Sequence, residues 1–166
     1  MVDIVSTETR SRMMAGIRGR DTRPEMIIRS GLHRRGFRFS LHAGGLPGRP
    51  DLVFTRYKAV ILVQGCFWHG HDCHLFKWPS TRPEFWREKI TGNVLRDRRA
   101  YLELRDLGWR ACEVWECTLK GRERQPVSDV LDACVEFLNS ENLYASIGGQ
   151  SRIVTCVPES IPPRGT

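Results

Sequence analysis

The sequence lacks several features that would place it in large classes of protein. No run of about 18 or more apolar residues occurs, which excludes a membrane-spanning helix. The N-terminal segment MVDIVSTETRSR has no apolar stretch of the length that a secretory signal needs, so we expect a cytoplasmic protein. No internal repeat and no linker-like segment are visible. The 166 residues therefore favour one domain with a single core.

The six cysteines lack the C-x-x-C spacing that is typical of thiol redox proteins and of many zinc sites. Thiols stay reduced in the cytoplasm, so these cysteines are expected to be free thiols or metal ligands. Cys112 and Cys134 fall within apolar periodicity, which predicts that both pack in the core. A redox function would also leave the tryptophans unexplained, and we reject it.

Acidic residues are scarce relative to basic ones. The chain has 26 Lys and Arg against 19 Asp and Glu, a formal net charge of +7. Such a balance is typical of proteins that bind polyanions, because phosphates attract Lys and Arg and release their counterions. On charge alone, mere solubility explains the excess equally well.

Periodicity and capping residues predict an α/β domain around one sheet. Thr22, Pro24 and Glu25 mark the start of a helix that Gly36 ends. The run AVILVQG from Ala59 predicts a strand covered on both faces. The predicted order is a short helix or arm at 6–19, a helix at 22–35, strands at 37–41, 51–54 and 59–64, a helix at 81–107, a strand at 109–116 and a helix at 128–139.

We divide the chain into three parts. Residues 1–20 form an N-terminal arm, 21–140 the core and 141–166 a C-terminal tail. Thr81 with Glu84 is predicted to form a capping box for the long helix, and Ser128 to cap the last one.

The stretch QGCFWHGHDCHLFKWP, residues 64–79, concentrates coordinating and aromatic side chains. Cys66, His71 and Cys73 form a C-x4-H-x-C pattern, and Cys117 follows a predicted strand that can lie beside them. Four such ligands suit a tetrahedral structural zinc ion. Spacing alone leaves buried cysteines and a surface histidine as an equal alternative. Three further histidines have no evident partner and are expected at the surface: His33, His42 and His74.

Phe67, Trp68, Phe76 and Trp78 crowd the same stretch. Aromatic rings beside positive charge can stack on bases or wedge between them, although such residues are more often core. Flanking glycines at 65 and 70 favour a loop that leaves the sheet, so Phe67 and Trp68 need not both point inward.

GRPDLVF is the next informative feature. In one large class of Mg²⁺ nucleases, Pro-Asp at the start of a strand is followed by Glu or Gln, any residue and Lys on the paired strand. Here Asp51 is followed 13 residues later by Gln64, with a cysteine at the lysine position. The pattern is weak, and a solvated Asp after a turn is its ordinary alternative. Mg²⁺ needs few protein ligands, however, and His69 could serve as the base.

Three segments together resemble the very short patch repair (Vsr) endonucleases: LPGRPDLVF, GCFWHGHDCHLFKWPSTRPEFWREKITGNVLRDRR and LGWRACEVWEC. The resemblance runs from about residue 9 to residue 122. It implies a restriction-endonuclease-like (PD-(D/E)xK-type) mixed sheet flanked by helices, with a structural zinc site. It also implies a Mg²⁺-dependent enzyme that nicks DNA beside the T of T:G mismatches, which arise when 5-methylcytosine deaminates.

The resemblance implies roles for particular residues. Asp51 corresponds to the Mg²⁺-binding carboxylate, and the backbone carbonyl of Val63 to a second ligand. His69 corresponds to a catalytic histidine and Glu25 to an acid that orients water at the metal. The zinc ligands that it implies are Cys66, His71, Cys73 and Cys117. The DNA-binding residues are Met14 of the arm, the wedge residues Phe67, Trp68 and Trp86, Lys89 and Asn93 at the wobble pair, and the backbone-binding Arg96, Arg98 and Arg99.

Gln64 is the main departure, because well-known members carry a histidine there. Glutamine cannot exchange a proton near neutral pH and can only donate or accept hydrogen bonds. We therefore include Gln64 in the catalytic set with a positioning role. The alternative is a zinc-stapled, mismatch-binding protein with reduced or lost nuclease activity. The resemblance further implies a bacterial, nucleoid-associated monomer that acts on double-stranded DNA, leaves room for repair-protein partners and has no membrane partner.

Overall fold

The computed structural model describes residues 6–15 and 19–148, without the side chains of residues 7, 10, 13 and 14. A five-stranded mixed sheet lies at the centre, in the strand order β1-β2-β3-β4-β5. The strands are β1 (Ser40–Leu41), β2 (Leu52–Phe54), β3 (Ala59–Gln64), β4 (Arg110–Trp115) and β5 (Tyr144–Ile147). The first three run antiparallel, and β3, β4 and β5 run parallel to one another.

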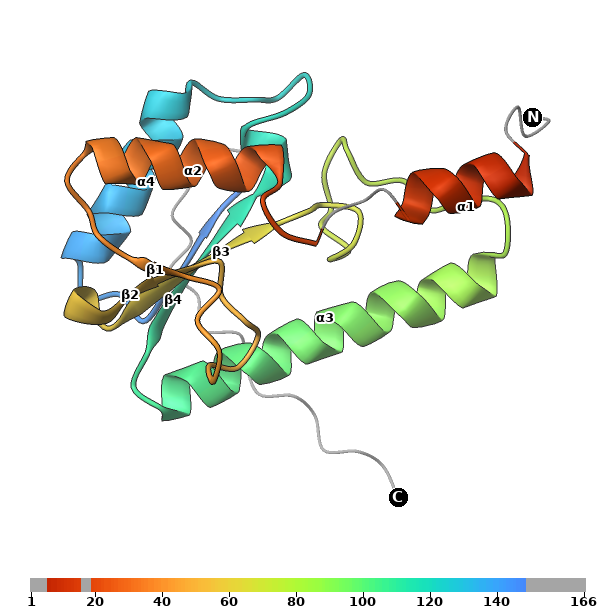
Figure 1. The fold of residues 1–166 in the computed structure, drawn as a ribbon. Coiled ribbons are helices and arrows are strands. Elements are labelled where there is room, and N and C mark those ends of the chain that lie inside the picture. The colour runs from red at the N-terminus through yellow and green to blue at the C-terminus, as the bar shows by residue number, and fades with distance from the viewer. Residues whose placement is uncertain (1–5, 16–18, 149–166) are drawn as a thin grey trace.

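Helices cover both faces of this sheet (Figure 1). The helices α2 (Arg23–Arg34) and α4 (Val127–Asn139) pack on one face, and α3 (Pro83–Asp106) crosses the other. The short α1 (Thr7–Ala15) stands apart from the sheet, on the side where α3 begins. The predicted α/β class and all four predicted helices are confirmed.

Apolar side chains form one cluster on each side of the sheet. The larger cluster fills the space under α2 and α4 around Ile28, Phe54 and Phe137, which are fully buried. The smaller one joins Val53 and Val60 of the sheet to Tyr101 and Leu104 of α3. Burial of such side chains is worth roughly 1.5–3 kcal/mol each, so both faces stabilise the sheet that carries the site.

Several local predictions need correction. Residues 144–147, placed in the C-terminal tail, form β5, which pairs with β4. The alternation of apolar and polar residues in YASI is too short to predict a strand from sequence. Pairing with the buried strand β4 makes this segment a strand. The helix α3 begins after Arg82 with no side-chain cap, so the capping box of Thr81 and Glu84 is wrong. Pro126, not Ser128, precedes α4 as its capping residue.

Within the described residues, no helix is both long enough and apolar enough to cross a membrane. Cys156 lies outside the described residues.

Candidate active site and metal centre

Asp51 stands where the chain enters β2, beside the neighbouring strand β3. Its Oδ2 accepts a hydrogen bond of 2.6 Å from the backbone N–H of Val63. Burial raises the pKa of Asp51 from 3.8 to about 6, with a further increase from the nearby Glu25 carboxylate. The charged carboxylate is therefore poorly solvated, which is the condition that a bound cation would relieve. Asp51 therefore lies beside the backbone of Val63, whose carbonyl the resemblance implies as the second Mg²⁺ ligand.

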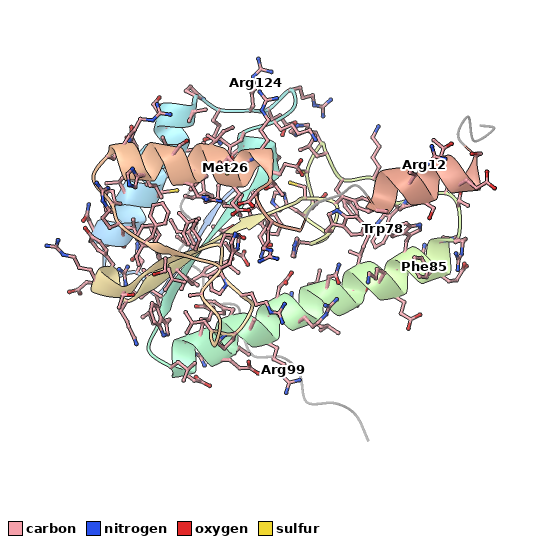
Figure 2. All side chains as sticks on the ribbon, viewed as in Figure 1. Arg12, Met26, Trp78, Phe85, Arg99 and Arg124 are labelled. Carbon is pink, nitrogen blue, oxygen red and sulfur yellow. The ribbon has the colours of Figure 1, made fainter. Side chains whose placement is uncertain are left out.

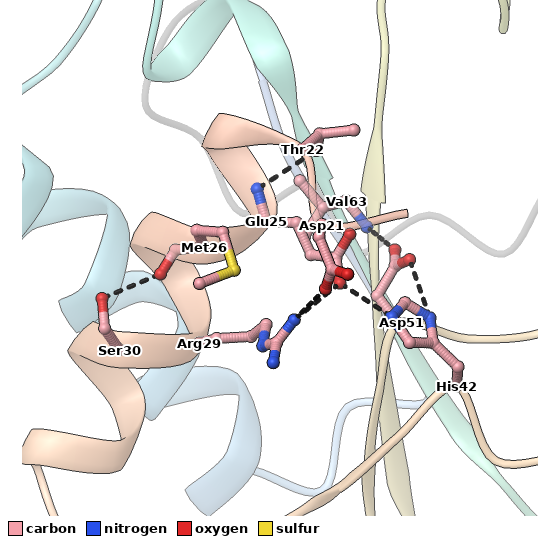
Figure 3. A network of polar contacts seen from close by, with 9 residues as sticks. All are labelled: Asp21, Thr22, Glu25, Met26, Arg29, Ser30, His42, Asp51 and Val63. Atoms are coloured by element: carbon pink, nitrogen blue, oxygen red, sulfur yellow. Dashed lines mark hydrogen bonds and ion pairs between the residues drawn. The ribbon is translucent and has the colours of Figure 1, made fainter. Parts of the chain in front are cut away.

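Glu25 lies beside Asp51 at the start of α2. Its backbone N–H donates to Oγ1 of Thr22 at 3.4 Å, as the predicted capping arrangement requires. Its carboxylate is 2% exposed and faces Arg29 at 3.5 Å and His42 at 3.1 Å (Figure 3). Arg29 and His42 compensate part of the desolvation energy that burial of the Glu25 carboxylate costs. Glu25 thus combines a helix-start position with a place in the site.

His42 was expected at the surface, and that prediction is wrong. Its side chain is only 20% exposed, with Nε2 at 3.1 Å from Glu25 and Nδ1 at 3.9 Å from Asp51 (Figure 3). Sequence spacing gave no signal, because His42 reaches the site through pairing of β1 with β2. Its backbone N–H donates to the carbonyl oxygen of Asp51 at 3.2 Å.

His69 lies in the loop after β3 and meets α3. Its Nδ1 is 2.6 Å from Oδ2 of Asp97. A charged carboxylate only accepts hydrogen bonds, so Nδ1 carries the proton and Nε2 is left as the basic nitrogen.

Asp97 is a site residue that the sequence analysis missed. It occupies an inward position of α3, in register with Ile90, Val94, Tyr101 and Leu104 at spacings of three and four. The sequence signal that could have identified Asp97 is an acidic residue within the apolar stripe of this helix. Such a residue needs a polar partner on the neighbouring element, and His69 provides it.

Gln64, at the end of β3, is 6% exposed. It lines a small cavity of about 20 Å³ with Asp97 and Glu113. A larger cavity of about 300 Å³ lies behind His69, and Glu113 and Tyr144 also line it. The hydroxyl of Tyr144 donates to Glu113 at 2.6 Å, while burial raises the pKa of that carboxyl group. Sequence reasoning gave no role to Glu113.

Four side chains form a second, separate centre. The Sγ and Nδ1 atoms of this Cys/His cluster all lie within 4.8 Å of one another, and its members are Cys66, His71, Cys73 and Cys117. His71 Nδ1 is 3.6 Å from the sulfur of Cys66 and 3.6 Å from that of Cys117. The indole of Trp115 stacks on the His71 ring at 4.1 Å and fixes its orientation.

The chemistry of this cluster suits a metal ion. The neighbouring Cys117 sulfur and burial together raise the pKa of the Cys66 thiol. A cation bound by the sulfurs reverses that effect, since coordination favours thiolates. Three sulfurs and one ring nitrogen are a common donor set for a structural zinc ion. Cys112 and Cys134 are fully buried in the core instead, as predicted.

Aromatic rings form a continuous cluster next to the Cys/His cluster. Phe67 contacts Trp68 at 5.2 Å and Trp86 at 5.3 Å between ring centroids. Phe76 and Phe85 extend the contacts on either side, and Trp78 packs on Phe76. This aromatic cluster consists of Phe67, Trp68, Phe76, Trp78, Phe85 and Trp86.

The aromatic cluster is incompletely buried. Trp78 is 53% exposed and Phe85 45% exposed, at the end of the molecule where α1 faces the start of α3 (Figure 2). Exposed rings of this size are costly in water, so the patch is a candidate for binding another molecule. Phe85 was not singled out from the sequence.

The predicted DNA-binding residues of α3 do not share one environment. Lys89, Arg96 and Arg98 are exposed. Asn93 donates to the backbone carbonyl of Trp68 at 2.8 Å, which ties α3 to the aromatic loop. Arg99 pairs with Glu103 at 3.1 Å and points from α3 away from the sheet (Figure 2). Met14 belongs to α1, but its side chain lies outside the described residues.

The other two histidines differ. His33 is exposed, as predicted. The prediction for His74 is wrong, because its side chain is 5% exposed, with Nδ1 at 3.2 Å from Glu123.

Comparison with known proteins fits this arrangement. The model of the family "DNA mismatch endonuclease Vsr" matches residues 2–75. The chain is 45% identical over 150 residues to the DNA mismatch endonuclease Vsr of Escherichia coli strain K12, covering 90% of this chain and 96% of that protein. It is 45% identical to the type II nicking enzyme V.XorIIP of Xanthomonas oryzae pv. oryzae over 72% of this chain and 88% of the relative.

A third relative is the type II nicking enzyme V.NmeAIP of Neisseria meningitidis serogroup A, 40% identical over 74% of this chain and 87% of that protein. The chain therefore belongs to the Vsr family of DNA mismatch endonucleases.

Proposed function

We propose that this protein is a Mg²⁺-dependent DNA endonuclease that nicks one strand beside the T of a T:G mismatch and so starts very short patch repair. The observation that carries the proposal is the placement of two polar pairs at one edge of the sheet, where β2 begins and β3 ends. Asp51 with Glu25 forms the carboxylate side, and His69 with Asp97 the basic side. The aromatic cluster borders the His69 loop.

Each residue has a defined part in this chemistry. When bound, Mg²⁺ would be held by Asp51 and the Val63 carbonyl and would polarise the phosphate. Nε2 of His69 takes a proton from the attacking water as its oxygen bonds to phosphorus. The bond from phosphorus to the 3′ oxygen breaks, and that oxygen takes a proton from solvent water, which leaves a 3′-hydroxyl and a 5′-phosphate. Asp97 holds the ring and compensates the charge that it gains.

Recognition is proposed to come from the aromatic cluster and α3. Phe67, Trp68 and Trp86 wedge between base pairs, at a cost of a few kcal/mol that is lowest where the pairing is already weak. Lys89 and Asn93 contact the wobble pair. Arg96, Arg98 and Arg99 contact the DNA backbone, and Met14 belongs to the arm that embraces the DNA. The partial exposure of these three rings and the net charge of +7 support this assignment.

The remaining assignments follow from the same site. The Cys/His cluster is proposed to hold a structural zinc ion, since its donor set fits one. The fold is proposed to be restriction-endonuclease-like, with residues 1–20 as a DNA-embracing arm and the core starting at 21. Because β5 pairs with β4, we extend that core to residue 147. Gln64 is assigned a positioning role, and the protein is proposed to act as a monomer at the bacterial nucleoid.

The test is incubation of matched and T:G-mismatched duplexes with the protein and Mg²⁺. Sequencing gels then report the strand, the position and the ends of each cut. We expect nicks in the T strand only, and none with Asp51→Asn. Asp106→Asn, an exposed acid at the end of α3, is the matched control and should keep the full rate. Equal cutting of matched duplexes would overturn the mismatch specificity.

A mismatch-binding protein without nuclease activity is the second candidate, favoured by Gln64 alone. It predicts binding of the T:G duplex with no cut strand in the same assay. The retained contacts of Asp51, Glu25 and His69 argue against it.

A further inference from the structure

The polar network around Glu25 and Asp51 contains an imidazole for which the proposed function has no role. His42 lies between the two carboxylates, with Nε2 at 3.1 Å from Glu25 Oε1 and Nδ1 at 3.9 Å from Asp51 Oδ1 (Figure 3). Its buried Nε2 lies within ion-pair distance of Glu25 but makes no hydrogen bond. The ring is therefore held in place by its backbone and its neighbours.

The backbone of His42 is arranged to deliver this ring. Its N–H donates to the carbonyl oxygen of Asp51 at 3.2 Å, which extends the pairing of β1 with β2 by one residue. Its φ is +44°, a left-handed conformation that side chains other than glycine rarely adopt. Such conformations persist where the surrounding structure enforces them, and they concentrate at functional sites.

Gln64 lies at the end of β3, on the side of the sheet that faces α3. Along β3 it alternates with Val60 and Leu62, whose side chains pack in the α3 cluster. Gln64 lines the small cavity beside Asp97. The site thus has an amide on β3 and an imidazole that comes from the end of β1.

We propose that His42 is a positioning residue of the nuclease site, which fixes Glu25 relative to Asp51 for a divalent cation and supplies the imidazole that β3 lacks. The proposal deepens the proposed function and rests on it. Arg29 holds the other side of Glu25 at 3.5 Å, and the hydrogen bond from Val63 holds Asp51. Both carboxylates are thereby held on opposite sides of one ring.

The test uses the full chain with zinc bound, and Mn²⁺ as the probe of the cation site. His42→Asn is the informative variant, because asparagine tolerates the left-handed backbone and removes the imidazole. We expect Mn²⁺ affinity, measured by electron paramagnetic resonance without DNA, to fall about 10–100-fold. The kcat for nicking should fall in parallel, while the Kd for the T:G duplex in Mn²⁺-free and Mg²⁺-free buffer stays unchanged.

Two further variants sharpen the result. His33→Asn, at an exposed position of α2, should match the wild type in every measurement. The double variant His42→Asn with Gln64→His returns an imidazole to the site from β3 and should recover at least tenfold in kcat over His42→Asn. Both variants carry asparagine at residue 42. A higher kcat in the double variant therefore cannot come from a restored backbone at that residue.

Wild-type Mn²⁺ affinity and kcat in His42→Asn would overturn the proposal. Failure of Gln64→His to restore activity would overturn the claim that the ring supplies what β3 lacks. If the wild type does not nick the T:G duplex, the proposed function fails, and Mn²⁺ affinity still decides whether His42 positions the carboxylates.

Discussion

Asp97 of α3 and His69 of the loop after β3 meet at 2.6 Å between Oδ2 and Nδ1. The pair connects the helix that carries the basic residues to the loop that carries aromatic residues and part of the Cys/His cluster. It also sets the tautomer of His69, because the carboxylate takes the Nδ1 proton and leaves Nε2 free. In the proposed mechanism, the position of α3 is in this way coupled to the chemistry at the phosphate.

This coupling predicts the effect of Asp97→Asn. The amide can donate to Nδ1 and so favours the tautomer with a proton on Nε2, which cannot act as a base. We expect the single-turnover nicking rate to fall about 10–100-fold, with the Kd for the T:G duplex unchanged. Asp106→Asn on the same helix is the control. An unchanged rate in Asp97→Asn would show that Asp97 does not orient His69.

The Cys/His cluster predicts a metal requirement for stability. Cys117→Ser removes one of four donors, so the bound zinc per chain, measured by elemental analysis, should fall well below one. The melting temperature should fall with it, because the metal links the loop after β3 to the end of β4. Cys134→Ala leaves a small cavity in the core and should keep its zinc. Full zinc content in Cys117→Ser would rule out the assignment.

Burial of Asp51 predicts that the carboxylate lowers the free energy of unfolding by an amount that depends on pH. The pKa is about 6 in the folded protein and 3.8 ordinarily. Between these values the folded protein binds more protons than the unfolded chain, so the free energy of unfolding falls as the pH rises. Above pH 6 the loss in the free energy of unfolding reaches its full value of up to about 3 kcal/mol.

Asp51→Asn should therefore stabilise the protein in Mg²⁺-free buffer, by more at pH 8 than at pH 5. The melting temperature measured by calorimetry should rise by roughly 5 °C at pH 8. Saturating Mg²⁺ should reduce this difference, since the cation stabilises only the wild type. Glu136→Gln, an exposed acid on α4, should show no such pH dependence. A destabilised Asp51→Asn at pH 8 would contradict the prediction.

The aromatic cluster predicts selective loss of mismatch binding. Trp86→Ala removes a ring that packs against Phe67 and Trp68. A stacked base is worth about 1–3 kcal/mol, so the Kd for the T:G duplex should rise about 10–100-fold in fluorescence anisotropy. Binding to matched duplex, which depends on charge, should change little. Leu107→Ala, at the exposed end of α3, is the control, and equal losses on both duplexes would refute the wedge role.

The local elements were largely predictable from the sequence. The apolar run in β3, the spacing along α3 and α4 and the Thr22 cap of α2 rest on contacts between near neighbours in the chain. The residues of the Cys/His cluster could be named because three of the four fall within eight residues and only a narrow set of donors suits zinc.

The sequence could not show which distant side chains meet. His42 reaches Asp51 through a strand pairing, Asp97 reaches His69 across the packing of α3 on the sheet, and β5 exists because β4 offers it an edge. Each of these contacts depends on the register of strands and the placement of a helix, which no local pattern encodes. The sequence by itself determined the chemical groups of this protein and the family it resembles. The tertiary structure decided their geometry, because hydrogen-bonded pairing and core packing bring together residues that lie far apart in the chain.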